Sequence, residues 1–460
     1  MARIDNLSNF LLDVANSIRT KKGTTGLIEI ANFDTEILSI PSGGGEVVSK
    51  DVNFYDYDGK LLYSYTKADF LELTEMPANP THEGLTSLGW NWTLQEAQTF
   101  LADKSFVDIG QVYEPTDGKT KIYVSITKSI LTPTLSFATN GTTTIDWGDG
   151  STPDTITGTD LTTIINTQHT YSTPGDYVIS IGSTNKVHVP LGDSAYGEKF
   201  FWGGVEPLTY YNRAFLLAVK KLIFSNIIDI TESYAFRLCQ SLEAVILPTI
   251  KVSGSYIFYG CSSLKHVTIP NVTNYSLPSS FFLLCSSLKS VSISPTTISL
   301  SAGCLANNQQ LTRVCIPNSV TSINGALFSD DLFDYIELPN NLTVIRGFND
   351  LVRVKRLVID SISTGAINLN NTASSMYNLT EVIVLCNVYR LQNSAFANNY
   401  ACLKYDFTHC TAVPVLSSTN VFNKINANCK IIVPDSLYNS WITANNWSTY
   451  ASYIVKESEA

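Results

Sequence analysis

The sequence predicts a mainly β, multidomain protein whose C-terminal half is a solenoid. An apolar pattern recurs eight times between residues 219 and 384, with 21 to 25 residues between successive central positions. Apolar and polar residues alternate inside each copy, which favours a short strand. A fixed period of this size marks a solenoid, because each unit buries its apolar face only by stacking on its neighbours. The 218 residues before the repeats leave room for further domains.

One copy shows the whole pattern, which reads Ala235-Phe236-x-x-Cys239-x-x-Leu242-x-x-Val245-x-Leu247-Pro248. Leu and Val are expected to face inward, and Pro ends the strand because it lacks a backbone N–H. This pattern resembles the BspA-type leucine-rich repeat family over roughly residues 210–435. The resemblance implies a curved right-handed solenoid of bacterial surface, adhesion and phage-associated proteins. Around Leu403-x-x-Asp406 the sequence departs from it, with Asp at the apparent inward position.

We therefore assign residues 191–435 to the solenoid and residues 436–460 to a C-terminal cap helix. A solenoid needs its last coil covered. The apolar face of the cap is supplied by Trp441, Trp447, Tyr450 and Ile454.

The nine cysteines are predicted to be structural. Cys239, Cys261 and Cys285 occupy the same position in successive copies. Stacked positions permit disulfides, but buried free thiols are the favoured interpretation. The sequence has no Cys-x-x-Cys pair and its five His residues are scattered, so we expect no metal site and no cofactor.

Residues 1–45 are predicted to be a helical attachment segment followed by a linker. An amphipathic helix over residues 3–20 is indicated by apolar residues at helical spacing, namely Ile4, Leu7, Leu11, Val14 and Ile18. Gly43-Gly44-Gly45 reads as a flexible linker. The opening, from Ile4-Asp5-Asn6-Leu7 to Phe33-Asp34-Thr35-Glu36-Ile37, resembles the start of tail-associated proteins of phages that infect Gram-positive bacteria. The resemblance implies attachment to a virion; a generic N-terminal helix is the alternative.

Residues 46–120 are predicted to form a small α+β module. Strand-like runs occur at residues 52–55 and 61–65, and a helical pattern begins near Thr93. Trp90 and Trp92 are interpreted as core residues, with stacking on a carbohydrate as the alternative.

Residues 121–190 carry the run Asp146-Trp147-Gly148-Asp149-Gly150 and, later, His169-Thr170-Tyr171. Trp147 offers a large core residue, and Gly-Asp-Gly favours a tight turn. The motif resembles the PKD-type immunoglobulin-like β-sandwich, which is the fold that the resemblance implies. Asp146 and Asp149 are interpreted as hydrogen-bonding residues of the turn, not as a catalytic pair.

The composition and the motifs of the chain argue against several classes of function. Charged residues make up only 15% of the chain and its net charge is −10, which argues against nucleic acid as a partner. The first 22 residues lack a secretory signal pattern, and no apolar run is long enough to span a membrane. Sequence motifs of catalysis are absent, so we expect a binding protein and not an enzyme.

The leading functional hypothesis is a phage tail- or baseplate-associated protein that recognises a host surface through its solenoid. Its partners would be a host cell-surface protein or glycan and, through residues 1–45, other phage tail proteins, with a homotrimer as the oligomer to test for. A bacterial cell-surface adhesin and a structural spacer are the alternatives. The expected location is the virion tail or the bacterial cell surface.

The expected ligand site lies on the outward side of the repeated strands. Residues that flank the central apolar position point away from the core, because side chains alternate along a strand. In the later copies these positions concentrate charge and an aromatic ring, in the row Arg313, Tyr335, Glu337, Arg356 and Glu381. Tyr and Arg are typical of binding hot spots. The alternative is a solvated face whose ion pairs contribute little energy.

Overall fold

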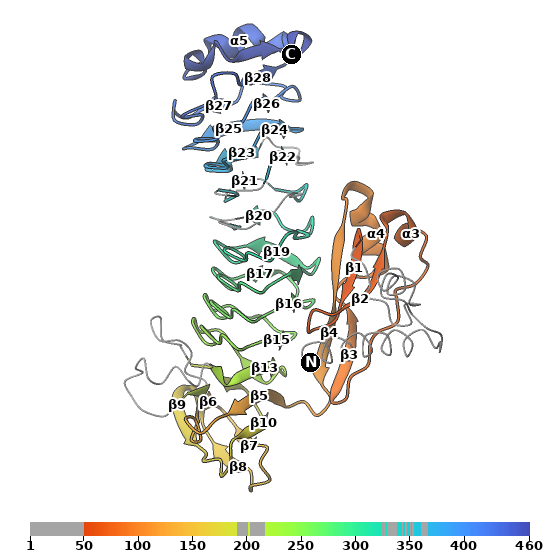
Figure 1. Cartoon of the computed structure of the whole chain (residues 1–460), viewed down its shortest axis with the longest axis vertical. Coiled ribbons are helices and arrows are strands. Elements are labelled where there is room, and N and C mark those ends of the chain that lie inside the picture. The colour runs from red at the N-terminus through yellow and green to blue at the C-terminus, as the bar shows by residue number, and fades with distance from the viewer. Residues whose placement is uncertain are drawn as a thin grey trace, which may run out of the picture. The chain divides into compact units, whose positions relative to one another are not determined.

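The computed structural model describes residues 50–190, 201–202, 217–323, 325, 327–328, 338–342, 344–345, 347–349, 351, 354–359 and 367–460. The predicted helix over residues 3–20 and the linker at residues 43–45 lie outside this part of the chain. The described residues are mainly β, with few helices and a β-solenoid in the C-terminal region (Figure 1).

Residues 50–115, called the α+β module below, form a four-stranded sheet with two short helices. The order is β2 (Leu61–Tyr65), β1 (Val52–Tyr55), β4 (Val107–Pro115) and β3 (Leu85–Trp90), and only the β1–β4 pair is parallel. The helices are α3 (Lys67–Leu71) and α4 (Leu94–Asp103). Helix α4 begins at a capping box made by Thr93 and Glu96, which satisfies backbone N–H groups of its first turn. The helix predicted to begin near Thr93 is thus confirmed.

Seven strands follow in two sheets that share one core. They are β5 (Thr120–Ile126), β6 (Thr134–Thr139), β7 (Thr142–Asp146), β8 (Asp154–Thr157), β9 (Asp160–Gln168), β10 (Gly175–Ser183) and β11 (Val187–His188). The indole of Trp147 is fully buried. The backbone carbonyl of Trp147 accepts a 2.9 Å hydrogen bond from the hydroxyl of Tyr171. Asp146 and Asp149 accept backbone N–H groups two residues further on, as the turn interpretation predicts.

Both sheets continue directly into the solenoid. Strand β13 (Val219–Ile223) pairs antiparallel with β5 and parallel with β15 (Ala244–Ile246), while β14 (Ile228–Asp229) pairs parallel with β11. One hydrophobic core therefore extends from Ile122 to Ile454. Strands β5 to β11 cover the first coil, which would otherwise expose apolar side chains and unpaired backbone.

The solenoid has two rows of short parallel strands. The first strand row contains β13, β15, β16 (His266–Thr268), β18 (Ser290–Ser292), β22 (Arg356–Ile359), β24 (Glu381–Val384), β26 (Lys404–Asp406) and β28 (Lys430–Val433). The second strand row contains β17 (Tyr275–Leu277), β19 (Thr297–Leu300), β20 (Ser322–Ile323), β21 (Val344–Ile345), β23 (Ile367–Asn370), β25 (Val388–Gln392) and β27 (Val415–Leu416).

The predicted inward positions are largely confirmed. Val267 pairs with Val291, Leu357 pairs with Val382, and their side chains are buried. The first strand row is not one unbroken sheet, however, because its described strands fall into three separate ladders. Val314 is buried without lying in an assigned strand, and Ile336 lies outside the described residues.

The repeat does not break at residue 403, which corrects the sequence alignment there. Tyr405 is buried and pairs with Val382 on one side and Ile431 on the other. Cys402 takes the inward Leu position, while Leu403 is exposed. The pattern therefore reads one residue earlier than predicted, and Asp406 points away from the core.

The cysteines are free and buried, as predicted. The thiol of Cys261 donates to the carbonyl of Phe236 at 3.4 Å, and the thiol of Cys285 donates to the carbonyl of Phe258 at 3.2 Å. Each thiol thus binds the backbone of the preceding coil. The rings of Phe236 and Phe258 stack at 5.7 Å beside these turns.

The C-terminal residues cover the last coil. They form η3 (Asp435–Leu437), α5 (Tyr438–Thr443), η4 (Trp447–Tyr450), β29 (Ile454–Lys456) and η5 (Glu457–Glu459). Trp441 and Trp447 are fully buried, and the indole N–H of Trp447 donates to the carbonyl of Pro414 at 2.7 Å. Strand β29 extends the first strand row by pairing with β28. The cap is therefore part helix and part strand.

Candidate binding site

The α+β module covers the outward side of the first strand row in the middle coils. Tyr55 stacks on His266, with the ring centroids 5.1 Å apart. Gly110 of β4 lies so close to Thr268 that a Cβ atom there would be 2.1 Å from the hydroxyl oxygen. His266 and Ser290, which point away from the solenoid core, are consequently buried. Small residues on the two facing surfaces, namely Gly110, Thr268 and Ser290, allow the close approach.

Asn91 and Trp92 fasten the α+β module to the edge of the solenoid. The Asn91 amide donates to the carbonyls of Ile269 at 3.1 Å and Ser292 at 3.0 Å, and the Trp92 indole donates to the carbonyl of Ile293 at 2.9 Å. Sequence analysis offered carbohydrate stacking as an alternative for both tryptophans. Trp90 is instead a core residue whose indole donates to the carbonyl of Pro77.

Arg313 belongs to the same contact, which corrects its predicted place in a ligand-binding row. Its guanidinium pairs with both carboxylate oxygens of Asp108, donates to the carbonyl of Lys50 at 2.8 Å, and lies 4.7 Å from the ring centroid of Phe106. The Asp108 side chain is 1% exposed. Arg313 therefore binds its own chain.

Of the four other residues in the predicted ligand-binding row, two lie in the described part of the chain and two do not. Tyr335 and Glu337 lie outside the described residues. Arg356 and Glu381 do lie side by side, 3.0 Å apart, and Glu381 also pairs with Lys404 at 3.1 Å. Lys404 in turn contacts Asp406 at 3.2 Å. These alternating charges satisfy one another at an exposed surface, where such pairs contribute about 0–1 kcal/mol.

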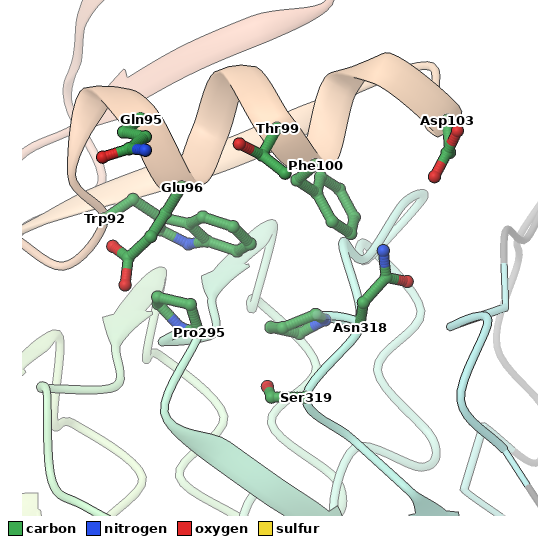
Figure 2. Close-up of a pocket in the computed structure, with 10 residues that line it drawn as sticks. Trp92, Gln95, Glu96, Thr99, Phe100, Asp103, Pro295, Asn318 and Ser319 are labelled. Atoms are coloured by element: carbon green, nitrogen blue, oxygen red, sulfur yellow. The ribbon is translucent and has the colours of Figure 1, made fainter.

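A cleft of 420 Å³ opens where helix α4 meets the solenoid edge (Figure 2). Trp92 and Phe100 point from the helix side toward Pro295 and Asn318 of two successive coils. From its sequence context, Trp92 is indicated only as a core residue or an isolated stacking ring. The cleft could not be predicted, because its two walls are some 200 residues apart in sequence and no local pattern links them.

The cleft combines an apolar floor with unpaired polar groups at its rim. The aromatic rings are nearly covered, with Trp92 3% and Phe100 6% exposed, so they form a floor with little ring surface open to a ligand. Glu96 is engaged in the capping box of α4. The remaining rim side chains Gln95, Thr99 and Asp103 have no side-chain partner among the residues that the structure describes.

Asn318 completes the rim from the solenoid side. Its Oδ1 accepts the backbone N–H of Asn340 at 3.1 Å, which fixes the orientation of the side chain and directs its NH₂ group elsewhere. The cleft thus presents amide and hydroxyl donors and acceptors with a single free carboxylate. This set is suited to hydroxyl-rich ligands.

Two classes of site are not found within the described part of the chain. No cluster of His, Cys, Asp and Glu there is suited to a metal ion. No described helix has both the length and the apolar character that crossing a bilayer requires.

Comparisons with known proteins agree with the repeat architecture. A family model described as a BspA type leucine rich repeat region (6 copies) matches residues 211–333 and 279–404. No curated protein matches the chain.

Several solved structures are similar over about half of the chain. The pneumococcal vaccine antigen PcpA is 14% identical over 52% of this chain, with a TM-score of 0.31, and the match spans 64% of that antigen. A leucine-rich repeat protein from Bacteroides ovatus is 16% identical over 52% of this chain and 84% of its own, with a TM-score of 0.28.

A leucine-rich cell surface protein from Faecalibacterium prausnitzii is 18% identical over 52% of this chain and 69% of its own, with a TM-score of 0.25. Identities this low do not transfer the role of any residue. The family match, over residues 211–404, shows that this part of the chain is similar to BspA-type leucine-rich repeat regions, in agreement with the two strand rows.

Proposed function

We propose that this chain is a non-enzymatic binding protein of a bacterial cell surface, which holds a surface glycan in the cleft between α4 and the solenoid. The repeat family supports a binding role, and one similar structure is described as a cell surface protein. Among the alternatives from sequence, the adhesin now has more support than the phage protein.

The observation that carries the proposal is the cleft itself. The α+β module is fastened on both sides of it, by Asn91 and Trp92 at one end and by Lys104 at the other. The Lys104 ammonium is buried and donates to the carbonyl of Leu338. A cleft with fixed walls binds without a large ordering cost.

The rim chemistry favours a glycan over a charged partner. Gln95, Thr99 and Asn318 are uncharged and offer both donors and acceptors, and Pro295 and Pro317 add apolar surface for the C–H faces of a sugar ring. The charged row at Arg356 and Glu381 is internally neutralised, so it has less to offer a ligand. A host surface protein at the same cleft is the alternative outcome.

A glycan array probed with the fluorescent full-length chain tests the proposal. The double variant Gln95→Ala/Asn318→Ala should weaken binding of any glycan that the wild type retains by about tenfold or more, because two hydrogen bonds are lost. Arg356→Ala is the matched control and should bind like the wild type. Equal binding by the double variant, or loss in the control, would place the glycan elsewhere.

A phage tail role remains the second proposal, and the resemblance that residues 1–45 show to tail-associated proteins favours it. In that case those residues would dock on other tail proteins or form a homotrimer, and the solenoid would recognise the host. Deleting residues 1–45 should then abolish incorporation into virions while leaving glycan binding intact. Unchanged incorporation would remove the phage role and leave the adhesin.

We further infer that residues 121–190 are a PKD-type sandwich. The support is the hydrogen bond from the Tyr171 hydroxyl to the backbone carbonyl of Trp147 and the stacking of His169 on the buried Trp147 indole, beside the Gly-Asp-Gly turn. Because this region shares its core with the solenoid, its proposed role is to cap the first coil and not to act as a separate stalk.

A further inference from the structure

A second hollow, of 350 Å³, lies at the start of the first strand row, away from the cleft. Strands β5, β13 and β15 are neighbours there, and their pairing places Tyr123, Lys221 and Ala244 side by side. The small Ala244 side chain leaves space between larger neighbours. Tyr57 of the α+β module and Lys220 also line the hollow.

Lys221 is held in this hollow without a carboxylate partner. Its ammonium lies 4.0 Å from the ring centroid of Tyr123 and 5.3 Å from that of Tyr57. The described residues place no acidic side chain within ion-pair distance of it, although Asp58 is close enough to raise its pKa slightly. Partial burial outweighs this influence and lowers the pKa of Lys221. The ammonium is therefore poorly solvated and incompletely neutralised.

The other groups around the hollow leave it with excess positive charge. Glu243 is paired with Lys265 at 2.7 Å, so these two charges cancel. Asp58 accepts the backbone N–H of Lys60 within its turn. Lys220 has no side-chain partner in the described part of the chain, so two lysines face one carboxylate.

Two phenol groups add hydrogen-bond donors. The hydroxyls of Tyr57 and Tyr123 have no hydrogen-bond partner among the described residues. Burial raises the pKa of both groups, so they remain protonated and able to donate at neutral pH. An ammonium and two O–H donors that meet in one hollow match the oxygens of an anion.

We propose that this hollow binds an oxyanion, namely a carboxylate, sulfate or phosphate group carried by an acidic surface polymer or free in solution. The site goes beyond the glycan cleft and shares no residue with it. A chain of net charge −10 repels anions at long range, so an acidic polymer needs a local positive site of this kind to bind.

Isothermal titration calorimetry of the full-length chain tests the site, with inorganic phosphate, sulfate and glucuronate titrated separately at constant ionic strength. A phosphodiester polymer and a polyuronate form the second pair of ligands, which separates free anions from polymer-bound ones. The wild type should bind at least one of these five ligands saturably. Lys221→Met, which keeps the aliphatic stem, should weaken that binding by about tenfold or more.

Lys289→Met is the matched control, because Lys289 is an exposed lysine of the next coils that does not line the hollow. It should bind like the wild type. Ala244→Leu should block binding by filling the hollow with all charges retained, and Tyr123→Phe provides a milder test that keeps the ring. Circular dichroism confirms that each variant is folded.

Absence of saturable binding to the wild type, or equal weakening by Lys221→Met and Lys289→Met, would overturn the proposal. The glycan array above reads out a different site. Loss of anion binding in Lys221→Met with intact glycan binding therefore supports both proposals separately.

Discussion

The guanidinium of Arg313 and the carboxylate of Asp108 form a two-pronged ion pair between the solenoid and the α+β module. The two residues are 205 positions apart in sequence. Because the Asp108 side chain is 1% exposed, the pair is shielded from water on the carboxylate side. It marks the point where the outward face of the solenoid becomes an internal interface.

The first prediction concerns this pair. Arg313→Ala should lower the free energy of unfolding by about 3 kcal/mol, because it leaves the buried Asp108 carboxylate without a counter-charge. Chemical denaturation measures the change. A solvent-exposed Arg313 side chain that served only a ligand would leave stability nearly unchanged when removed, so the measurement separates the two interpretations.

Arg356→Ala is the control for that experiment. Arg356 also pairs with a carboxylate, but its side chain is 58% exposed. Its loss should cost less than about 1 kcal/mol. Equal costs for the two variants would show that the Arg313 side chain is solvated and that the α+β module does not cover it.

The second prediction concerns the effect of His266 on stability at acidic pH. Burial under the α+β module lowers the pKa of His266 from 6.5 to about 3. Below pH 6.5 the unfolded chain binds a proton that the folded chain does not, so stability falls as the pH falls, until about pH 3. The loss from this one group is about 1.4 kcal/mol per pH unit.

His266→Asn removes this proton linkage but keeps a polar side chain. The variant should be less stable than the wild type at pH 7, and the gap should shrink by about 2 kcal/mol at pH 5. Urea denaturation at both pH values measures it. A gap that stays constant between pH 7 and pH 5 would mean that His266 is accessible to protons in the folded state.

The third prediction concerns the stacked thiols. The Cys285 thiol is fully buried and donates to the carbonyl of Phe258. Burial raises the pKa of Cys285 to about 12. Iodoacetamide at pH 8 should therefore modify Cys285 only after denaturation, as read by mass spectrometry, because the thiolate is the reactive form. Rapid native labelling would contradict the stacked-turn structure.

The fourth prediction uses the close approach of Gly110 to Thr268. A methyl group on Gly110 would meet the Thr268 side chain at 2.1 Å, so Gly110→Ala should separate β4 from the solenoid locally and expose His266. Hydrogen exchange of the strands β16 and β18 should then increase. Adding Thr268→Ala should restore part of the protection. If Gly110→Ala exchanges like the wild type, the two surfaces are not in contact.

Sequence could predict the parts of the fold that repeat. The Leu-x-x-Val spacing located the inward residues of most coils, because burial on one face of a strand imposes alternation on the sequence. It misplaced the coil at residue 403 by one position, since Cys402 and Tyr405 stand where Leu and Val do elsewhere. A repeat pattern that is defined by its commonest residues misaligns a coil in which other residues occupy the inward positions.

The candidate site was not predictable in the same way. Ser290 and Ser292 looked unremarkable on an outward face, yet they are buried because the α+β module lies over them. Arg313 looked like a ligand-binding residue because its partner, Asp108, is remote in sequence. Contacts between segments that are distant in sequence produce neither a repeat nor a motif, so sequence patterns do not predict them.

The most direct test of the central claim is to fill the cleft between α4 and the solenoid. Thr99 is exposed on α4 and lines the cleft, so Thr99→Trp should occupy the space without disturbing the core. Flow cytometry would measure binding of the fluorescent full-length chain to target cells, beside Arg356→Ala as control. Thr99→Trp should lose cell binding, while Arg356→Ala should keep it. Full binding by folded Thr99→Trp would contradict the assignment of the ligand to this cleft.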